Sequence, residues 1–153
     1  MAIKNLTSGA VFAQLTVPAV VTGTGSFVET TNRVDVRGEE FATVLVAVGA
    51  MAATTTLDAK LTQSNAATSG TSKDLGTVAL TQVLTASGAS KVYAFEIRTT
   101  QLDSANGFYW LSLSHKITNT NTTALDVIAI LTSARAAPVT SGLTQTVTLF
   151  TTN

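Results

Sequence analysis

The sequence contains few side chains that could catalyse a reaction or hold a metal ion. It has one histidine, His115, and no cysteine. A histidine needs a nucleophile or further ligands beside it before it can form a catalytic pair or a metal site. His115 shares one side of an expected strand with Leu111, Leu113 and Ile117. We therefore expect a strand-end residue half packed in the core.

The acidic residues also lack the spacing of a reactive site. Glu39–Glu40 is the only adjacent carboxylate pair, and it falls in an expected turn, where we interpret it as a solvated pair. Hydrolysis by two carboxylates needs groups held about 5–9.5 Å apart in a cleft. Four aspartates are scattered without the spacing of a calcium loop, although a calcium site built from distant loops stays open: Asp58, Asp74, Asp103 and Asp126. The sequence thus predicts a protein that is not an enzyme and has no cofactor.

Three kinds of short motif are explained more simply by a structural role than by ligand binding. The stretch GTGS (23–26) is followed by no helix signal, so it predicts a turn and no phosphate site. The NLT and NTT sequons (5–7 and 121–123) matter only on a secretory route. Trp110, in GFYW, could stack on a sugar, but in a strand a tryptophan more often borders a core. A carbohydrate-binding module, with Trp110 as the glycan contact, remains an alternative.

Composition limits the partners of the chain. Its 153 residues predict one domain, and only 12% are charged, with 9 basic and 9 acidic residues. This balance disfavours nucleic acid, which needs a basic face. We expect no membrane span, no signal peptide and no small-molecule substrate. Abundant Thr, Ser and Ala predict a weakly hydrated surface that packs against other proteins.

Apolar and polar residues alternate in short runs. Residues 1–20 are expected to form an arm followed by a first strand. Further strands are expected at 32–38, 41–50, 57–62, 91–99, 108–117, 124–134 and 143–150, and 77–86 could be a strand or a short helix. Tyr93, Phe95 and Ile97 should share one face, as should Val34 and Val36. The polar run that follows Leu61 should be an inert loop.

The number and spacing of these strands predict an all-β fold, a β-sandwich of jelly-roll type with about eight or nine strands and extended terminal arms. We divide the chain into an N-terminal arm and first strand (1–20), a β-sandwich domain (21–138) and a C-terminal strand or arm (139–153).

Four stretches, in their order, resemble a family of small virion proteins of tailed bacteriophages: RVDVRGEEFATVLVAVGA, TLDAKLTQSNAATSG, SKVYAFEIRT and DVIAILTSARAAPV. The likeness covers about residues 32–139. Where the family commonly has Asp-Asp-Gly after a strand, this chain has Ser64-Asn65-Ala66-Ala67. An ion-binding or turn role of those acids is therefore not carried over.

The resemblance implies a capsid decoration (cement) protein on the outside of the shell, made in the host cytoplasm, often as a homotrimer. Its partners would be the major capsid protein and neighbouring copies of itself. A tail, head–tail junction or capsid subunit is the alternative. The two apolar termini suit strand addition to a partner. Candidate interface residues are Val11, Phe12, Leu15, Val17, Val147, Leu149 and Phe150.

Overall fold

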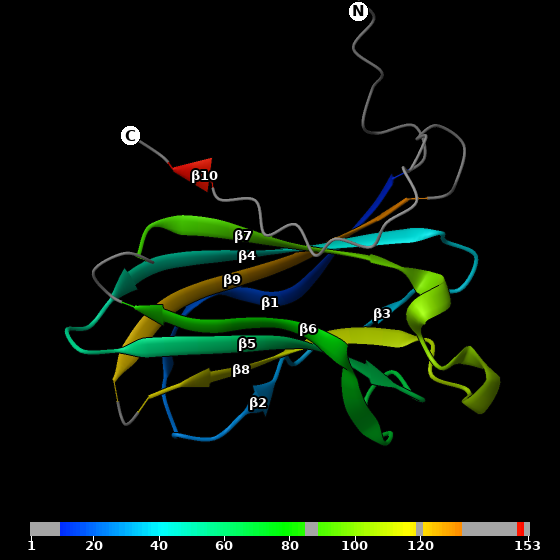
Figure 1. The fold of residues 1–153 in the computed structure, drawn as a ribbon, viewed down its shortest axis with the longest axis horizontal. Coiled ribbons are helices and arrows are strands. Elements are labelled where there is room, and N and C mark those ends of the chain that lie inside the picture. The colour runs from blue at the N-terminus through cyan, green and yellow to red at the C-terminus, as the bar shows by residue number, and fades with distance from the viewer. Residues whose placement is uncertain (1–9, 85–88, 119–120, 133–149, 152–153) are drawn as a thin grey trace, which may run out of the picture.

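The computed structural model describes residues 10–84, 89–118, 121–132 and 150–151, which form two antiparallel sheets packed as a sandwich (Figure 1). One sheet has the strand order β1-β9-β4-β7-β10, and the other has the order β2-β8-β5-β6, with β3 also paired to β8. The strands are β1 (Ala10–Thr22), β2 (Val28–Glu29), β3 (Val34–Asp35), β4 (Phe41–Met51), β5 (Thr56–Ser64), β6 (Ser72–Leu84), β7 (Lys91–Arg98), β8 (Trp110–Ile117), β9 (Thr122–Thr132) and β10 (Phe150–Thr151).

The path of the chain is that of a jelly roll. From β1 to β9, successive strands cross from one sheet to the other except at β2–β3 and at the β5–β6 hairpin, where both strands lie in the same sheet. β2 and β3 pair with the two halves of β8, so they act as two pieces of one strand. Apart from the short β10 at the edge of the first sheet, eight strand positions in two sheets of four remain, as in a double Greek key. The predicted all-β sandwich is confirmed.

β4 shows why these sequences form central strands. Ala42, Val44, Val46 and Val48 are buried, while the residues between them are partly exposed. Successive side chains of a strand point to opposite faces, and β-branched valine is well tolerated there. β4 is hydrogen-bonded on both sides, to β7 and β9. The apolar run predicted at 41–50 is therefore the middle of its sheet.

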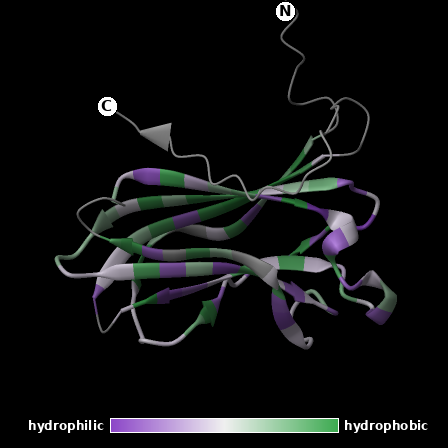
Figure 2. Cartoon of the chain, in the orientation of Figure 1, coloured by the Kyte–Doolittle hydropathy of each residue, from purple (hydrophilic) through white to green (hydrophobic). Residues whose placement is uncertain are grey.

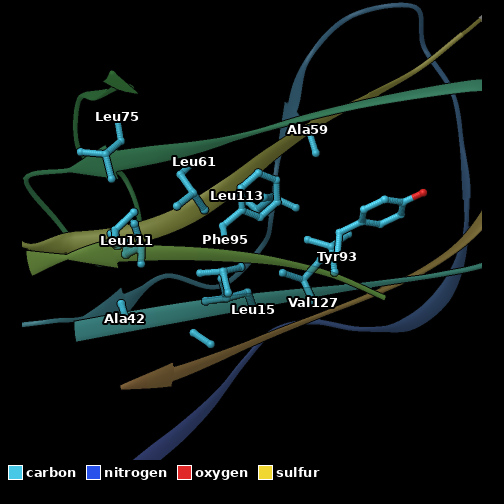
Figure 3. Packing of buried hydrophobic residues seen from close by; sticks show 14 of the residues in the cluster. Leu15, Ala42, Ala59, Leu61, Leu75, Tyr93, Phe95, Leu111, Leu113 and Val127 are labelled. Carbon is cyan, nitrogen blue, oxygen red and sulfur yellow. The ribbon is translucent and has the colours of Figure 1, made fainter. Parts of the chain in front are cut away.

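The core lies between the sheets (Figure 3). Phe95 of β7 projects toward Leu61 and Leu113 of the opposite sheet, and all three are essentially inaccessible to water. Each such side chain contributes about 1.5–3 kcal/mol by leaving water. Tyr93 and Ile97 are buried on the same face of β7, as their alternation predicted.

β5 is longer than the predicted 57–62. Its polar–apolar alternation, visible in Figure 2, ends at Leu61, but the strand continues through Thr62, Gln63 and Ser64, all of them buried. Their side chains find partners: the Thr62 and Ser112 hydroxyl oxygens are 2.8 Å apart, and Gln63 accepts from the Asp103 amide. The prediction that the strand ends at Thr62 is wrong, because hydrogen bonding allows Gln63 and Ser64 to be buried in its continuation.

The strand predicted at 32–38 is mostly irregular. Only Val34–Asp35 pairs with β8, although Val34 and Val36 are both buried, as expected. The chain then turns: the Glu39 amide donates to the Val36 carbonyl, and Gly38 has φ +84°. Alternation correctly predicted the buried side, but a turn ends the pairing.

β6 settles the strand-or-helix ambiguity at 77–86 in favour of a strand, which begins earlier, at Ser72. Its pairing with β5 has two register shifts, and Gln82 has φ +49° with its amide bonded to the Asp58 carboxylate. Such bulges interrupt the alternation that a regular strand would show.

The described helices are two 3-10 turns, η1 (Thr99–Gln101) and η2 (Ser104–Asn106), between β7 and β8. Across the described residues, no helix has the length and apolarity needed to span a membrane. The predicted arm residues 1–9, and 143–149 of the last predicted strand, lie outside the described part; Phe150–Thr151 pairs with Lys91–Val92 of β7.

Candidate docking flank and end pocket

β1 and β2 are edge strands of the two sheets, and they lie on the same side of the sandwich. Asn32, which follows β2, joins them: its backbone amide donates to the Leu15 carbonyl, and its side-chain amide donates to the Gln14 carbonyl, both at 3.2 Å. These two edges therefore form one continuous flank.

Exposed apolar side chains are concentrated on this flank. In the part of the chain whose side chains are described, six large apolar residues are exposed. Five of them belong to β1, to β2 or to the residue just before β2. Those five, which we call the docking flank, are Val11, Phe12, Val20, Phe27 and Val28. The sixth is Leu84, at the end of β6 on the opposite side. Such clustering of exposed apolar residues is typical of an interaction surface.

The edge of β1 is only partly protected against pairing with another strand. Pro18 and two register shifts disrupt its middle, and Asn32 occupies the Gln14 and Leu15 carbonyls. The first residues, Ala10–Ala13, pair with β9 on one side and with no described strand on the other. β1 contains no charged residue, whereas charge is a common protection of edge strands.

Arg33 fixes the connection between β2 and β3 on the outer face of the second sheet. Its side chain is only 9% exposed, and all five of its N–H groups have acceptors. Nε and Nη2 each donate at 3.0 Å to one carboxylate oxygen of Glu29. The remaining groups donate to the Ser64 hydroxyl, the Ala66 carbonyl and the Ser72 hydroxyl, at 2.7–2.9 Å.

Glu29 is the anionic centre of this network. Burial acts to raise the pKa of its carboxyl, but hydrogen bonds from Arg33, Ser112 and Ser72 prevail and lower that pKa below the ordinary 4.5. Glu29 is thus a carboxylate at neutral pH. The network ties the flank to the loop after β5, where the Ala66 carbonyl accepts a hydrogen bond from Arg33.

The predicted interface residues have different environments. Val11 and Phe12 are 50% and 55% exposed, whereas Leu15 is completely buried in the core and has no surface to offer a partner. Val17 lies in β1 and Phe150 in β10, where only the backbone is described. Val147 and Leu149 lie outside the described residues.

His115 faces the core, as predicted, but is more deeply buried than half, with 7% of its surface exposed. Neither ring nitrogen has a hydrogen-bond partner among the described residues. Burial lowers the pKa of this imidazole below its usual 6.5. His115 is therefore a neutral core residue.

The four aspartates are dispersed, each with its own partner. Asp58 pairs with Lys116, Asp74 with Lys60 and Asp103 with Lys73, while Asp126 accepts from Gln14. Within the described residues, no three His, Cys, Asp or Glu side chains gather as a metal site would require.

Glu39 differs from the solvated residue that we predicted. It is half-buried, and its Oε2 atom is buried without a hydrogen-bond partner in the described structure. Glu39 lines a pocket of about 250 Å³ at the end of the sandwich where the β3–β4 turn meets the η1–η2 loop. Turns that are remote in sequence meet there because β3–β4 and β7–β8 connect strands at the same end.

Phe108 and Tyr109 contribute aromatic rings to this pocket, but Trp110 does not line it. Trp110 is the first residue of β8, half-buried and paired with Asp35 and Ser64. The GFYW motif thus divides, with its first two aromatic residues in the pocket and its tryptophan on the sheet.

Sequence reasoning missed Val20, Phe27 and Val28 of the docking flank, and the Arg33–Glu29 pair. The four-residue spacing of Glu29 and Arg33 would indicate an ion pair only if the chain turned back between them. The sequence of residues 30–32 does not predict such a turn. Phe27 also lies beside two lysines, with the Lys60 ammonium 4.3 Å and the Lys116 ammonium 5.7 Å from its ring centre.

No protein-family model matches the sequence, and no curated protein sequence matches it. Among solved structures, the fold is similar to a chain in the structure of infectious bursal disease virus, Gx strain, with a TM-score of 0.51 and 9% sequence identity. The match covers 84% of this chain and 33% of the viral chain, so this chain spans about a third of the length of that neighbour. At this identity the likeness shows the fold alone: a β-sandwich that also occurs in a protein of a virus.

Proposed function

We propose that this chain is a structural protein of a virus particle, and specifically a decoration protein that binds the outside of a tailed-phage capsid. The observation that carries the proposal is the docking flank: exposed apolar side chains at the edge of a jelly roll whose first strand, β1, carries no charge. The similarity of the fold to a viral chain and the resemblance of the sequence to small virion proteins support it.

The flank has the physical properties that docking requires. Burying apolar surface contributes about 25 cal/mol per Å², and covering Val11, Phe12 and Val20 desolvates no charge. The free edge at Ala10–Ala13 could add a strand from a neighbour. The proposed partners are the major capsid protein and other copies of this chain, assembled as a homotrimer. Many such contacts, repeated by the symmetry of a shell, would resist pressure from within.

The protein would act without catalysis and without a cofactor. His115 is buried away from any described partner, and Asp58, Asp74 and Asp103 are each paired with a different lysine. A structural role needs no further chemistry.

Copy number tests the location. The amount of this chain relative to the main shell protein would be measured in purified virions, with heads and tails separated. A ratio near one, or a simple fraction of one, in the head fraction is expected. A few copies with the tails would replace decoration by the tail or head–tail alternative, and absence from the virion would overturn the proposal.

A binding experiment tests the flank. Full-length protein carrying Phe12→Asp or Val20→Asp is added to heads that lack it, and bound protein is quantified. We expect at least about tenfold weaker binding, because a buried charge is costly. Leu84→Asp is the matched control, since Leu84 is 48% exposed on the opposite side. If all three variants bind like the wild type, the docking flank is not the contact surface; circular dichroism verifies that each is folded.

A further inference from the structure

The pocket at the end of the sandwich is lined by none of the docking-flank residues. It is bounded by the turn after β3 and by the loop that carries η1 and η2, drawn in yellow-green in Figure 1. Val36 and Leu102, both buried, form apolar parts of its lining. Its volume of about 250 Å³ is below the 300–1,000 Å³ of drug-sized sites. The space is therefore suited to one small ring.

The lining combines aromatic rings with free hydroxyls. Phe108 and Tyr109 are half-buried, so part of each side chain is accessible. Thr100 and Ser104 are exposed, and neither hydroxyl bonds to another described residue. A hydroxyl both donates and accepts, and an aromatic ring presents an apolar face. A ligand that meets both needs several hydroxyls and an apolar side.

The charges around the pocket disfavour an ionic ligand. Arg37 is bound to Asp35 and lies 5.5 Å from the centre of the Tyr109 ring. Lys73 is bound to Asp103 and lies 4.1 Å from the Phe108 ring. Because both cations are paired with carboxylates, neither is available to hold an anion, and an anion would also meet Glu39. A cationic ligand would compete with Arg37 and Lys73 for the two aromatic rings.

Glu39 adds an acceptor without a donor. Its Oε2 is covered by protein, so a ligand hydroxyl could reach it only after the side chain turns toward the pocket. A buried acceptor without a partner is costly, and a donor at this position would relieve that cost.

We propose that this pocket binds one neutral sugar ring of a glycan. The C–H face of the sugar would pack on the side of the Tyr109 or Phe108 ring that Arg37 or Lys73 does not cover, and its hydroxyls would bond with Thr100, Ser104 and Glu39. This activity does not depend on the docking flank, so the virion role and glycan binding can fail separately. It also assigns sugar contact to the first aromatic residues of GFYW in place of Trp110.

The test is titration of the full-length, isotope-labelled protein with methyl glycosides of glucose, galactose, mannose and N-acetylglucosamine, followed by NMR. We expect at least one sugar to shift the backbone signals of Gly38, Thr100 and Ser104, with an affinity in the millimolar range, as a single ring allows. The double variant Thr100→Ala/Ser104→Ala should weaken that affinity at least about tenfold.

The control is Thr31→Ala/Ser69→Ala, which removes two exposed hydroxyls elsewhere and should leave the affinity unchanged. Shifts confined to Trp110 and its neighbours, equal affinity of both double variants, or no shift with any of the four sugars would each overturn the proposal.

Discussion

Arg33 binds both carboxylate oxygens of Glu29, with two parallel hydrogen bonds of 3.0 Å, across the outer face of the β2-β8-β5-β6 sheet. The two residues flank the β2–β3 connection, and the same guanidinium binds Ser64, Ala66 and Ser72 around the β5–β6 hairpin. One side chain thus joins the docking flank to a loop more than 30 residues away in sequence.

Replacing Arg33 should destabilise the protein. Arg33→Ala leaves the Glu29 carboxylate largely buried without its cation, and we expect a loss of about 2–3 kcal/mol in the free energy of unfolding. Urea denaturation at pH 7 measures it. Arg37→Ala is the control, because Arg37 is exposed, and its ion pair with Asp35 should change stability little. Equal effects of the two substitutions would contradict a special role for Arg33.

The network should also make stability depend on acid pH. The folded-state pKa of Glu29 lies below the ordinary 4.5, so its ionised form stabilises the fold above about pH 4.5 and that contribution is lost as the pH falls through the folded-state pKa. The difference in unfolding free energy between wild type and Glu29→Gln should therefore be larger at pH 7 than at pH 3. A difference that is the same at both pH values would show that the ionisation of Glu29 is not involved.

His115 should weaken the fold at a milder pH. Because burial lowers its folded-state pKa below 6.5, the unfolded chain binds the proton more readily, and stability falls as the pH drops below 6.5. Thermal unfolding between pH 7 and pH 5 should show this fall in the wild type and a smaller one in His115→Leu and His115→Gln. Parallel curves for all three proteins would mean that another group is responsible.

Gly70 closes the loop that Arg33 binds. A Cβ at this position would lie 2.3 Å from the Asn65 Oδ1 and 2.8 Å from the Ala66 backbone nitrogen. Gly70→Ala should therefore displace the loop and cost about 1–3 kcal/mol in unfolding free energy. At Gly38, by contrast, a Cβ has open space, and only its φ of +84° resists substitution. Gly38→Ala should cost less, about 1 kcal/mol; the reverse order in chemical denaturation would contradict the tight loop.

Regular alternation predicted the parts of the fold that obey it. In β7, Tyr93, Phe95 and Ile97 are buried together, and the apolar run of β4 is central in its sheet. The predicted end of the strand at Thr62 was too early, since Gln63 and Ser64 are polar yet buried, and their hydrogen-bond partners Asp103 and Arg33 are remote in sequence. At β6 the sequence left a strand and a short helix equally open, because two register shifts in the pairing with β5 interrupt the regular alternation of apolar and polar residues.

The candidate sites were less predictable than the strands. Phe12 was identified because it belongs to an uncharged apolar run, but Leu15 in the same run is buried. Val20 and Phe27 become neighbours of one flank only because β1 and β2 are the edges of two different sheets. The pocket could not be predicted either, because Glu39 and Tyr109 are 70 residues apart and meet only through the jelly-roll connections.

By itself the sequence determined the class of fold. It also showed that the chain has one histidine and no cysteine, and therefore few side chains suited to catalysis or metal binding. Hydrophobic period and composition are local properties, and they indicate which face of a regular strand leaves water and how few His and Cys side chains the chain contains. The tertiary structure alone decided which exposed apolar residues share a flank and how all the N–H groups of Arg33 find acceptors. It also decided that Tyr109 and Glu39 line the same pocket. Those relationships depend on how strands distant in sequence are paired, and strand pairing is set by the packing of the whole domain.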